Sequence, residues 1–352
     1  MKVGMVVIGR NEGERLRRCL ESVVGSVESL VYVDSGSTDG SVTLARHMGI
    51  EVVELDMAEP FSAARARNAG YAALVRVKPD TRYVQFVDGD CELVPGWLDV
   101  ACDAMERRQE LAIAAGRLRE REPEASIYNR LGEIEWNFLG TGDVESVGGI
   151  FMIRREAFDG VGGFDPTVRA GEEPELCQRL RRLGWVISRL DADMAWHDLA
   201  MRRFGHWWKR QIRGGYGGLD VAIRFDLPRF RRNNLRARFW TAWPLFVALT
   251  GAGIGSLAGL LPGWIAALTV FCLWPVQMAR IGLRTWRQGQ PARIALAYAF
   301  FTMVSFWPQM LGQAQFLLDR ARNHSRRLIE YKAAAPPGRW VDRGRTLPGV
   351  DP

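Results

Sequence analysis

Residues 83–97 read YVQFVDGDCELVPGW, and this stretch decides the fold that the rest of the chain is expected to form. A short apolar run with strand-forming residues stops at Asp88-Gly89-Asp90. Two carboxylates at the end of a buried strand suit a divalent cation and a diphosphate, and the glycine between them would let a phosphate approach closely. The alternative is a pair of solvated acids in a turn, so the surrounding sequence has to decide between the two.

Apolar runs and helical patterns alternate along the first part of the chain. The alternation predicts strands at 3–8, 30–33 and 51–55 and helices at 12–24 and 40–48. This order is typical of βαβ units, and therefore of a mostly parallel sheet with helices on both faces. Ligands of such sheets bind at the carboxyl ends of the strands, so the residues that follow each strand are the candidates for a binding site.

Polar residues follow three of the expected strands at that end. They are Arg10, Asn11 and Glu12 after the first strand, Asp34 after the second, and Asp88 and Asp90 after the strand at residue 83. Asp34 precedes a turn rich in serine and glycine, and an acid there suits hydrogen bonds to ribose hydroxyls or to the edge of a base. Arg67 lies on a helix from which it could reach a phosphate. Asn11 has a simpler alternative, as the cap of the helix that begins beside it.

Charge is segregated along the 352 residues. Residues 1–201 hold 24 basic and 34 acidic side chains, residues 202–238 hold 11 and 2, and residues 239–352 hold 12 and 4. An acidic first part followed by a basic belt predicts that the belt faces anionic lipid, with nucleic acid as the competing partner. The apolar segments that follow favour lipid, so no nucleic-acid partner is expected. The five cysteines have no paired or metal-ligand spacing, which indicates reduced thiols in the cytosol, and the N-terminus carries no secretory signal pattern.

The apolar segments lie in the last third of the chain. No charged residue occurs at 239–278, twice the ~20 residues that one membrane span requires. Pro262 divides this run and predicts a transmembrane hairpin at 240–260 and 264–283, with both ends in the cytosol because both are flanked by arginine. A third apolar stretch at 294–318 is followed by arginines that a third span would place outside, so an interfacial or re-entrant helix is expected there.

The order of the motifs VVIGRNE, VDSGSTDGS, ARNAG, FVDGD, VGGIFMIRREAF, GGFD and AGEEPELCQRLRRLGW resembles that of the family 2 glycosyltransferases. The resemblance covers about residues 1–217. It implies the α/β GT-A fold, a Rossmann-like mixed sheet that binds a nucleotide-diphospho-sugar. It also implies that the chain transfers a sugar from a UDP-, GDP- or dTDP-sugar to an acceptor hydroxyl, with inversion and with Mg²⁺ or Mn²⁺.

The resemblance also implies roles for individual residues. Donor contacts fall on Ile8, Arg10, Asn11, Glu12, Asp34, Arg67, Asp88, Gly89 and Gly149, and metal contacts fall on Asp88, Asp90 and His197. A cation that bridges the donor phosphates would stabilise the departing nucleoside diphosphate. The absence of a side chain at Gly149 would leave room for a sugar ring against the backbone. The family often has Pro-x-x-Asn at the first strand end, and here Ile8-Gly9-Arg10 precede Asn11 instead.

Glu172 and Glu173 are the candidates for the catalytic base. The acceptor proton must pass to a carboxylate on the side of the sugar opposite the leaving group. Pro174 fits the first turn of a helix, which places both acids at the helix entrance. The alternative is that they only complement the helix dipole. The family motif has the base at its second acid, so the resemblance implies Glu173, with Glu172 as the second choice.

Residues 201–217, MRRFGHWWKRQIRGGYG, predict an amphipathic helix at the membrane surface, with Trp207 and Trp208 in the headgroup region. Membrane-bound relatives have a Gln-x-x-Arg-Trp motif over the active site here. This chain has no matching Arg-Trp pair, so only the expectation that Arg210 or Arg213 approaches the donor phosphates carries over.

These observations predict a catalytic domain followed by membrane-associated segments. The expected divisions are a catalytic domain at 1–217, a basic juxtamembrane linker at 218–238, a transmembrane hairpin at 239–283, a third apolar helix with a basic segment at 284–332, and a disordered tail at 333–352. We expect the catalytic domain on the cytoplasmic side of the inner (plasma) membrane and a lipid-linked or cell-envelope glycan as acceptor. Two short hydrophobic helices are too few for a polymer channel, so limited transfer is expected.

Two other functions fit parts of the sequence. A sugar-phosphate nucleotidylyltransferase shares a similar nucleotide-binding half, but its glycine-rich loop is longer than Gly9-Arg10-Asn11. A catalytically degenerate membrane scaffold would keep the fold, but the presence of Asp34 and Glu173 argues against it.

Overall fold

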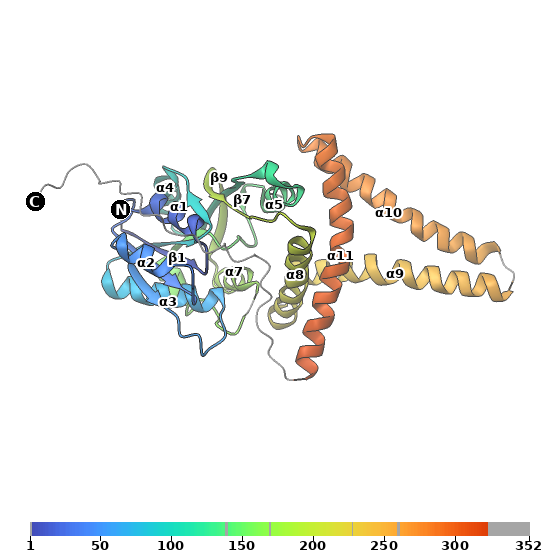
Figure 1. Cartoon of the computed structure of the whole chain (residues 1–352), viewed down its shortest axis with the longest axis horizontal. Coiled ribbons are helices and arrows are strands. Elements are labelled where there is room, and N and C mark those ends of the chain that lie inside the picture. The colour runs from blue at the N-terminus through green and yellow to red at the C-terminus, as the bar shows by residue number, and fades with distance from the viewer. Residues whose placement is uncertain (1, 138–139, 169, 227, 259–260, 323–352) are drawn as a thin grey trace, which may run out of the picture.

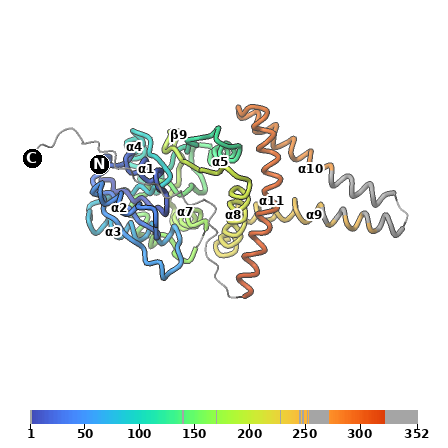
Figure 2. Tube along the Cα trace, in the orientation of Figure 1, coloured from blue at the N-terminus to red at the C-terminus, as the bar shows by residue number. Residues whose placement is uncertain are grey.

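The chain forms an α/β head followed by three long helices (Figure 1). The computed structural model describes residues 2–137, 140–168, 170–226, 228–258 and 261–322. The predicted disordered tail at 333–352 lies outside these residues. In Figure 2 the blue-to-green trace of the head is compact, and the orange and red helices stand beside it.

The head is built on a nine-stranded mixed sheet. Eight of its strands follow the order β3-β2-β1-β4-β8-β6-β9-β5, and the ninth, β7, pairs with β9. Its parallel half consists of β3 (Glu51–Glu54), β2 (Ser29–Asp34), β1 (Val3–Gly9) and β4 (Tyr83–Asp88). In the other half β8 (Phe151–Arg154) runs antiparallel to β4 and to β6 (Leu111–Glu120), and β9 (Val186–His197) runs parallel to β6. The short strands β5 (Cys91–Leu93) and β7 (Gly142–Asp143) run antiparallel to β9. The predicted Rossmann-like mixed sheet is confirmed.

Helices cover both faces of this sheet. They are α1 (Glu14–Val23), α2 (Ser41–His47), α3 (Ala63–Val77), α4 (Trp97–Arg107), α5 (Ile127–Asn137), α6 (Arg155–Gly160) and α7 (Glu172–Arg182), with a 3₁₀ turn at Pro123–Ala125. Strand β1 is buried from Val3 to Ile8, as expected of a parallel strand covered on both sides. Helix α3 lies close to the sheet because residue 70 is glycine, where a Cβ would stand 2.3 Å from Val6 Cγ1.

The C-terminal part consists of α8 (Phe204–Phe225), α9 (Pro228–Ala258), α10 (Leu261–Arg287) and α11 (Ala292–Ala321). Helices α9 and α10 run side by side away from the head, and α11 crosses between them and α8 (Figures 1 and 2). The head is therefore joined to the projecting pair through α8 and α11.

Two glycines let α8 and α11 cross at backbone contact. A Cβ at Gly215 would stand 2.1 Å from the carbonyl oxygen of Gln309, and a Cβ at Gly312 would stand 2.1 Å from the carbonyl oxygen of Ile212. Helices approach this closely only where small residues face each other. Because α11 runs unbroken through Pro308, the segment at 294–318 does not turn back on itself, and the re-entrant alternative is wrong.

The prediction of a linker at 218–238 is wrong, because residues 218–225 and 228–238 belong to helices. Helix α8 continues to Phe225, so the expected boundary at 217 falls inside it, and α9 begins at Pro228. Proline suits the first turn of a helix, where its missing N–H costs no hydrogen bond. The glycines of α8 permit close packing, since a Cβ at Gly217 would stand 2.6 Å from Cβ of Ala170.

The expected position of Trp207 in a headgroup layer is also wrong. Its side chain is 1% exposed and belongs to a cluster with Leu199 and Met201. Its ring stacks on Tyr128, with centroids 6.3 Å apart, and meets Phe301 edge-on at 5.2 Å. Trp207 therefore joins α8 to α5 and α11.

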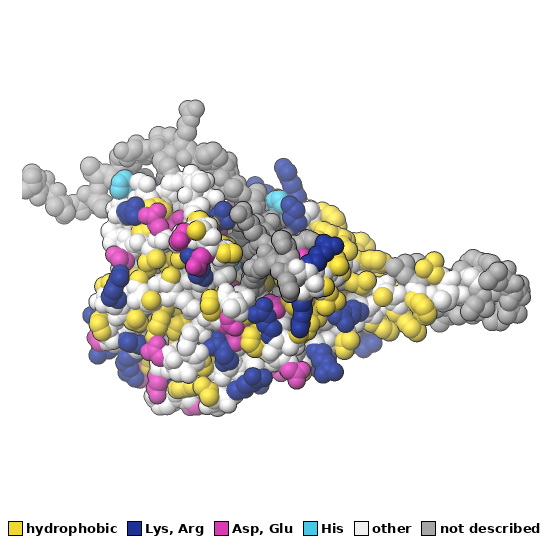
Figure 3. Space-filling view, turned by 90° about the horizontal axis from the view of Figure 1, so that it is seen from below, with side chains coloured by type: hydrophobic (Ala, Val, Ile, Leu, Met, Phe, Trp, Pro, Cys, Tyr) yellow, Lys and Arg dark blue, Asp and Glu magenta, His cyan; other side chains and the backbone are white. Residues whose placement is uncertain are grey.

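Large apolar side chains remain exposed on the projecting helices. They include Phe239, Trp243, Phe246 and Leu249 on α9 and Leu273, Val276, Leu283 and Trp286 on α10. Figure 3 shows hydrophobic side chains along this projection and Lys and Arg side chains where it meets the head. Among the described residues, α11 alone is long and apolar enough to cross a membrane by length and composition.

Candidate active site

Arg67 on α3 brings together three acids from distant parts of the chain. Its side chain is 2% exposed. Nη2 donates to Asp88 Oδ1 at 3.0 Å. Nη1 donates to Glu172 Oε1 at 3.1 Å and to Glu173 Oε1 at 3.3 Å. The acids at the end of β4 and at the start of α7 therefore meet in one place, as the sequence predicted, and Arg67 lies between them.

Glu173 has the electrostatic environment of a proton acceptor. Its side chain is 16% exposed at the first turn of α7. Burial and the neighbouring charge of Glu172 raise the pKa of Glu173 to about 7, against the opposing effect of Arg67. A carboxylate with a pKa near neutrality can take a proton from an alcohol more readily than an ordinary exposed glutamate.

The backbone of Gly149 lies directly against this centre. A Cβ at this residue would stand 2.4 Å from Arg67 Nη2 and 3.0 Å from both Asp88 Oδ2 and Glu173 Oε1. No L side chain fits there without moving one of the charged groups. Arg67, Asp88 and Glu173 therefore fill the space beside Gly149, and the contact of this backbone with a sugar ring stays a prediction.

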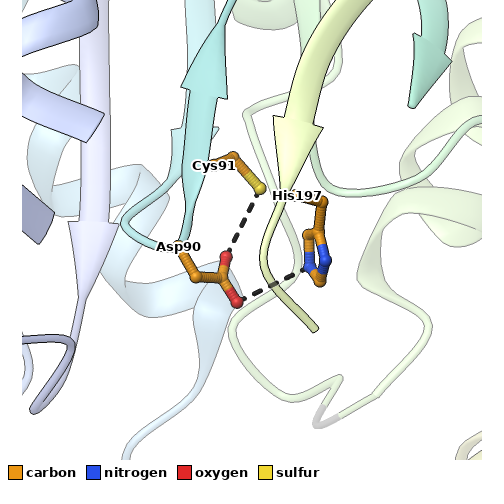
Figure 4. A group of neighbouring side chains, drawn as sticks. All are labelled: Asp90, Cys91 and His197. Atoms are coloured by element: carbon orange, nitrogen blue, oxygen red, sulfur yellow. Dashed lines mark hydrogen bonds and ion pairs between the residues drawn. The ribbon is translucent and has the colours of Figure 1, made fainter. Parts of the chain in front are cut away.

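Asp90, Cys91 and His197 form a second cluster (Figure 4). Antiparallel pairing of β5 with β9 sets Cys91 opposite His197. His197 Nε2 lies 3.5 Å from Asp90 Oδ2, and Cys91 Sγ donates to Asp90 Oδ1 at 3.4 Å. Trp136 on α5 packs its ring edge-on against the His197 ring, with centroids 4.4 Å apart. Strand pairing and the tryptophan thus fix the imidazole beside the carboxylate.

The protonation states in this cluster suit a hard divalent cation. Burial lowers the pKa of His197 to about 4, so the imidazole is neutral, as a metal ligand must be. Burial, with the nearby charge of Asp88, raises the pKa of Cys91 well above its usual range. The thiol therefore stays protonated and donates a hydrogen bond. The carboxylate fits Mn²⁺ or Mg²⁺, both of which prefer oxygen ligands, and the imidazole fits Mn²⁺ better than Mg²⁺; a neutral thiol fits neither ion.

Asp88 is not among the three side chains of this cluster, and the expectation that Asp88 and Asp90 share a metal stays a prediction. The Asp88 side chain is 34% exposed and accepts the hydrogen bond from Arg67. Strand β4 ends at Asp88, and Asp90 lies in the turn that leads to β5. Cys91 was not identified from the sequence, and its position next to Asp90 is the only sequence signal for it.

The sequence predicted that the missing side chain of Gly89 lets a phosphate approach. In the structure, neighbouring protein atoms lie where a side chain of residue 89 would stand. A Cβ there would stand 3.2 Å from the Ile8 carbonyl oxygen, 3.3 Å from Leu16 Cδ1 and 3.5 Å from Glu12 Cγ. Its N–H donates to the Ile8 carbonyl at 2.8 Å. The space beside Gly89 is therefore filled by β1 and α1. Glu12 itself pairs with Arg15, with 2.8 Å between Oε2 and Nη2.

Asp34 and Asn11 tie together the loops after β1 and β2. Asp34 is 2% exposed, and its carboxylate accepts from Tyr32 Oη at 2.9 Å, Gly36 N at 2.9 Å and Ser37 N at 2.8 Å. Asn11 has a left-handed φ of 54°, and its Oδ1 accepts from Thr38 N at 2.7 Å. Asn11 does not cap α1, which has no side-chain cap. Contacts of Asn11, Glu12 and Asp34 with a nucleoside, and of Arg10 with the donor, stay predictions.

A cavity of about 840 Å³ opens beside the two glutamates of α7. Five arginines from three helices line it, namely Arg210, Arg213, Arg229, Arg236 and Arg284. Arg210 Nη1 also lies 2.6 Å from Oε2 of Glu135, a lining residue that the sequence interpretation missed. The cavity lies between the end of the head that holds Glu172 and Glu173 and the helices α9, α10 and α11.

Known proteins share parts of this sequence and fold. The sequence profile described as glycosyl transferase family 2 matches residues 5–162, and the profile described as the N-terminal domain of galactosyltransferase matches residues 142–202. A pre-mycofactocin glycosyltransferase of Mycobacterium tuberculosis is 29% identical over 286 residues, which cover 76% of this chain and 56% of that protein. The chain thus spans about half the length of the curated relatives that it matches over most of its own length.

Two further similarities are more limited. A TPR repeat-containing protein of Synechococcus elongatus is 31% identical over 135 residues, 38% of this chain and 31% of that protein. Among solved structures, the mannosyltransferase PcManGT of Pyrobaculum calidifontis, in complex with GDP-Man and Mn²⁺, superposes with a TM-score of 0.56. The two are 16% identical, and the superposition covers 88% of this chain and 87% of that one. This likeness is one of fold, and the fold is GT-A.

Proposed function

The chain belongs to glycosyltransferase family 2, and we propose that it transfers a sugar from a nucleotide-diphosphate-sugar to an acceptor hydroxyl with inversion at the anomeric carbon. The observation that carries this proposal is the joining of Asp88 and Glu173 through Arg67, with the bare backbone of Gly149 against all three. Asp88, on the side where a diphosphate would lie, and Glu173, the proposed base, are thus bound by the two terminal nitrogens of one guanidinium group.

In the proposed reaction the acceptor oxygen bonds to the anomeric carbon while the bond from that carbon to the donor phosphate oxygen breaks. The electron pair of the broken bond leaves with the nucleoside diphosphate, and the acceptor proton passes to Glu173. Arg67 holds Glu173 in place, and its contacts with Asp88 and Glu172 preserve its position after Glu173 becomes neutral.

Asp90 and His197 would hold the divalent cation, Mn²⁺ or Mg²⁺. Bound there, the cation would supply positive charge that stabilises the diphosphate as it leaves. The Mn²⁺ and GDP-Man of PcManGT support this class of donor and metal, although that structure shares only the fold. Asp88 lies on the same rim, and Arg210 and Arg213 line the neighbouring cavity.

The test is sugar release from a panel of UDP-, GDP- and dTDP-sugars by the purified full-length protein, with and without Mn²⁺. Asp90→Ala and Glu173→Gln should lose activity, whereas the exposed acids Asp99 and Glu156 serve as matched controls for Asp99→Ala and Glu156→Gln. Full activity in both site variants would refute the assigned roles. Nucleotide binding without sugar release by the unaltered protein would support a catalytically degenerate scaffold instead.

We further propose that α9 and α10 enter the inner membrane, with the head on its cytoplasmic side and a lipid-linked or cell-envelope glycan as acceptor. The exposed apolar side chains of both helices support membrane insertion, because soluble surfaces rarely gather large exposed apolar side chains in one place. Membranes of cells that make the full-length chain should retain it after a sodium carbonate wash. Recovery in the wash would contradict insertion.

A further inference from the structure

The cavity beside Glu172 and Glu173 has a wall that the reaction at Arg67 does not use. This wall is formed by α9, α10 and α11, all beyond the head. It carries Arg229 and Arg236 from α9 and Arg284 from α10. We call these three residues the arginine wall.

The arginine wall is built by helix periodicity. Arg229 and Arg236 are seven residues apart, two helical turns, and therefore lie on the same face of α9 together with Asn233. Helix α10 contributes Ile281, Arg284 and Thr285, which share one face in the same way. Two separate helices thus direct guanidinium groups at one space.

The acids that line the cavity already have arginine partners. Glu135 pairs with Arg210, while Glu172 and Glu173 both bond to Arg67. The lining as a whole holds five arginines and three glutamates, so its charge is positive. A space of this size with excess positive charge attracts an anion.

Helix α11 adds a polar stripe to this space. Tyr298, Thr302, Ser305 and Gln309 follow one another at intervals of four, three and four residues, and all line the cavity. The opposite side of this helix exposes apolar residues such as Leu296, Phe300 and Leu311. An otherwise apolar helix therefore places hydroxyl and amide groups toward the cavity. Ser305 Oγ donates to the Thr302 carbonyl, and Gln309 Nε2 donates to Ser305 Oγ and to Gln211 Oε1, so this side of the cavity is polar and tied together by hydrogen bonds.

We propose that the arginine wall binds a phosphate group of the acceptor and thereby holds the acceptor hydroxyl beside Glu173. Several guanidinium forks match a phosphate, which has three oxygen acceptors and up to two negative charges, better than they match a single carboxylate. The inference rests on the proposed glycosyl transfer only in calling this ligand the acceptor.

The test is titration of the full-length protein, in an uncharged maltoside detergent, with geranyl phosphate, geraniol and inorganic phosphate. We expect geranyl phosphate to bind and geraniol not to bind. Arg236→Gln combined with Arg284→Gln should weaken geranyl phosphate binding by about tenfold or more, because charge-assisted hydrogen bonds are lost. Arg236→Lys combined with Arg284→Lys should recover part of the affinity, because charge is kept.

The matched control is Arg232→Gln with Arg287→Gln, which removes the same charge from exposed positions of the same two helices outside the cavity lining. It should bind geranyl phosphate as the unaltered protein does. Equal weakening by both double variants, or binding of geraniol as tight as that of geranyl phosphate, would overturn the proposal.

The titration with inorganic phosphate distinguishes a soluble phosphorylated acceptor from a lipid phosphate. Inorganic phosphate that binds as tightly as geranyl phosphate, with the same loss in the Arg236 and Arg284 variant, supports the site and points to a soluble phosphorylated acceptor. Weaker binding of inorganic phosphate supports the site and points to a lipid phosphate. Sugar release by the unaltered protein is measured separately, so failure of the proposed transfer and failure of the phosphate site are distinguishable.

Discussion

The backbone of Gly149 touches the guanidinium of Arg67, since a Cβ at residue 149 would stand only 2.4 Å from Nη2. Arg67 is buried and bonded to three carboxylates, so any displacement of its guanidinium lengthens or breaks at least one of these bonds. The position of Glu173 relative to Asp88 therefore depends on the absence of a side chain at residue 149.

Gly149→Ala should lower kcat/KM for sugar release by at least about tenfold, because the added methyl group displaces Arg67 and with it the proposed base. Steady-state kinetics of the purified variant measure this. Gly148→Ala is the matched control, since a Cβ at residue 148 has nothing within 4 Å. Equal losses in the two variants would show that the loop, and not the contact with Arg67, is responsible.

Sugar release should depend on pH through Glu173. Burial and Glu172 raise the pKa of Glu173 to about 7, and a base acts only when deprotonated, so the rate should rise with pH and level off above about pH 7. Glu172→Gln removes one cause of the raised pKa and should move this inflection to lower pH. The measurement is kcat/KM from pH 5 to 9, with Glu156→Gln as control. An inflection that stays in place in Glu172→Gln would contradict the coupling.

His197→Ala should weaken the activating effect of Mn²⁺ by roughly 10- to 100-fold, because the imidazole beside Asp90 is lost as a ligand. Titration of activity with Mn²⁺ measures the change. Cys91→Ser should leave the Mn²⁺ dependence nearly unaltered, since the thiol is protonated and a hydroxyl can donate the same hydrogen bond to Asp90. Loss of the metal in Cys91→Ser would show that a thiolate coordinates it.

Gly312→Ala should lower the free energy of unfolding by about 1–3 kcal/mol, because its Cβ would stand 2.1 Å from a carbonyl oxygen of α8. Thermal unfolding in detergent measures this effect. Gly214→Ala on α8 is the control, since a Cβ at residue 214 has nothing within 4 Å and alanine favours the helix. A variant at residue 312 as stable as this control would mean that the crossing is looser than the structure describes.

The head was predictable because its signals are local. Periodicity predicted β1, β2 and β3 and the helices between them, and the resemblance to a family predicted that Asp88 and Glu173 share one site. Sequence spacing could not show that Arg67 would be the residue that joins them, because the direction of one side chain on a helix depends on what packs around it.

The remaining errors concern contacts between segments that are distant in sequence. Trp207 has the composition expected of an interfacial helix, but it is buried because α5 and α11 meet there. Cys91 reaches His197 only through the pairing of β5 with β9. The arginine wall needs two helices aligned side by side, and no single stretch of sequence contains that alignment.

The crossing of α8 and α11 has a mechanical consequence. Its closest contacts, at Gly215 and Gly312, are made by main-chain atoms, and rotation of side chains cannot loosen them. The close crossing therefore restricts tilting of α8 against α11, and with it changes in the distance between Glu173 and the projecting pair. A substrate that is anchored at the projecting pair would need a length that matches this distance in order to reach Glu173.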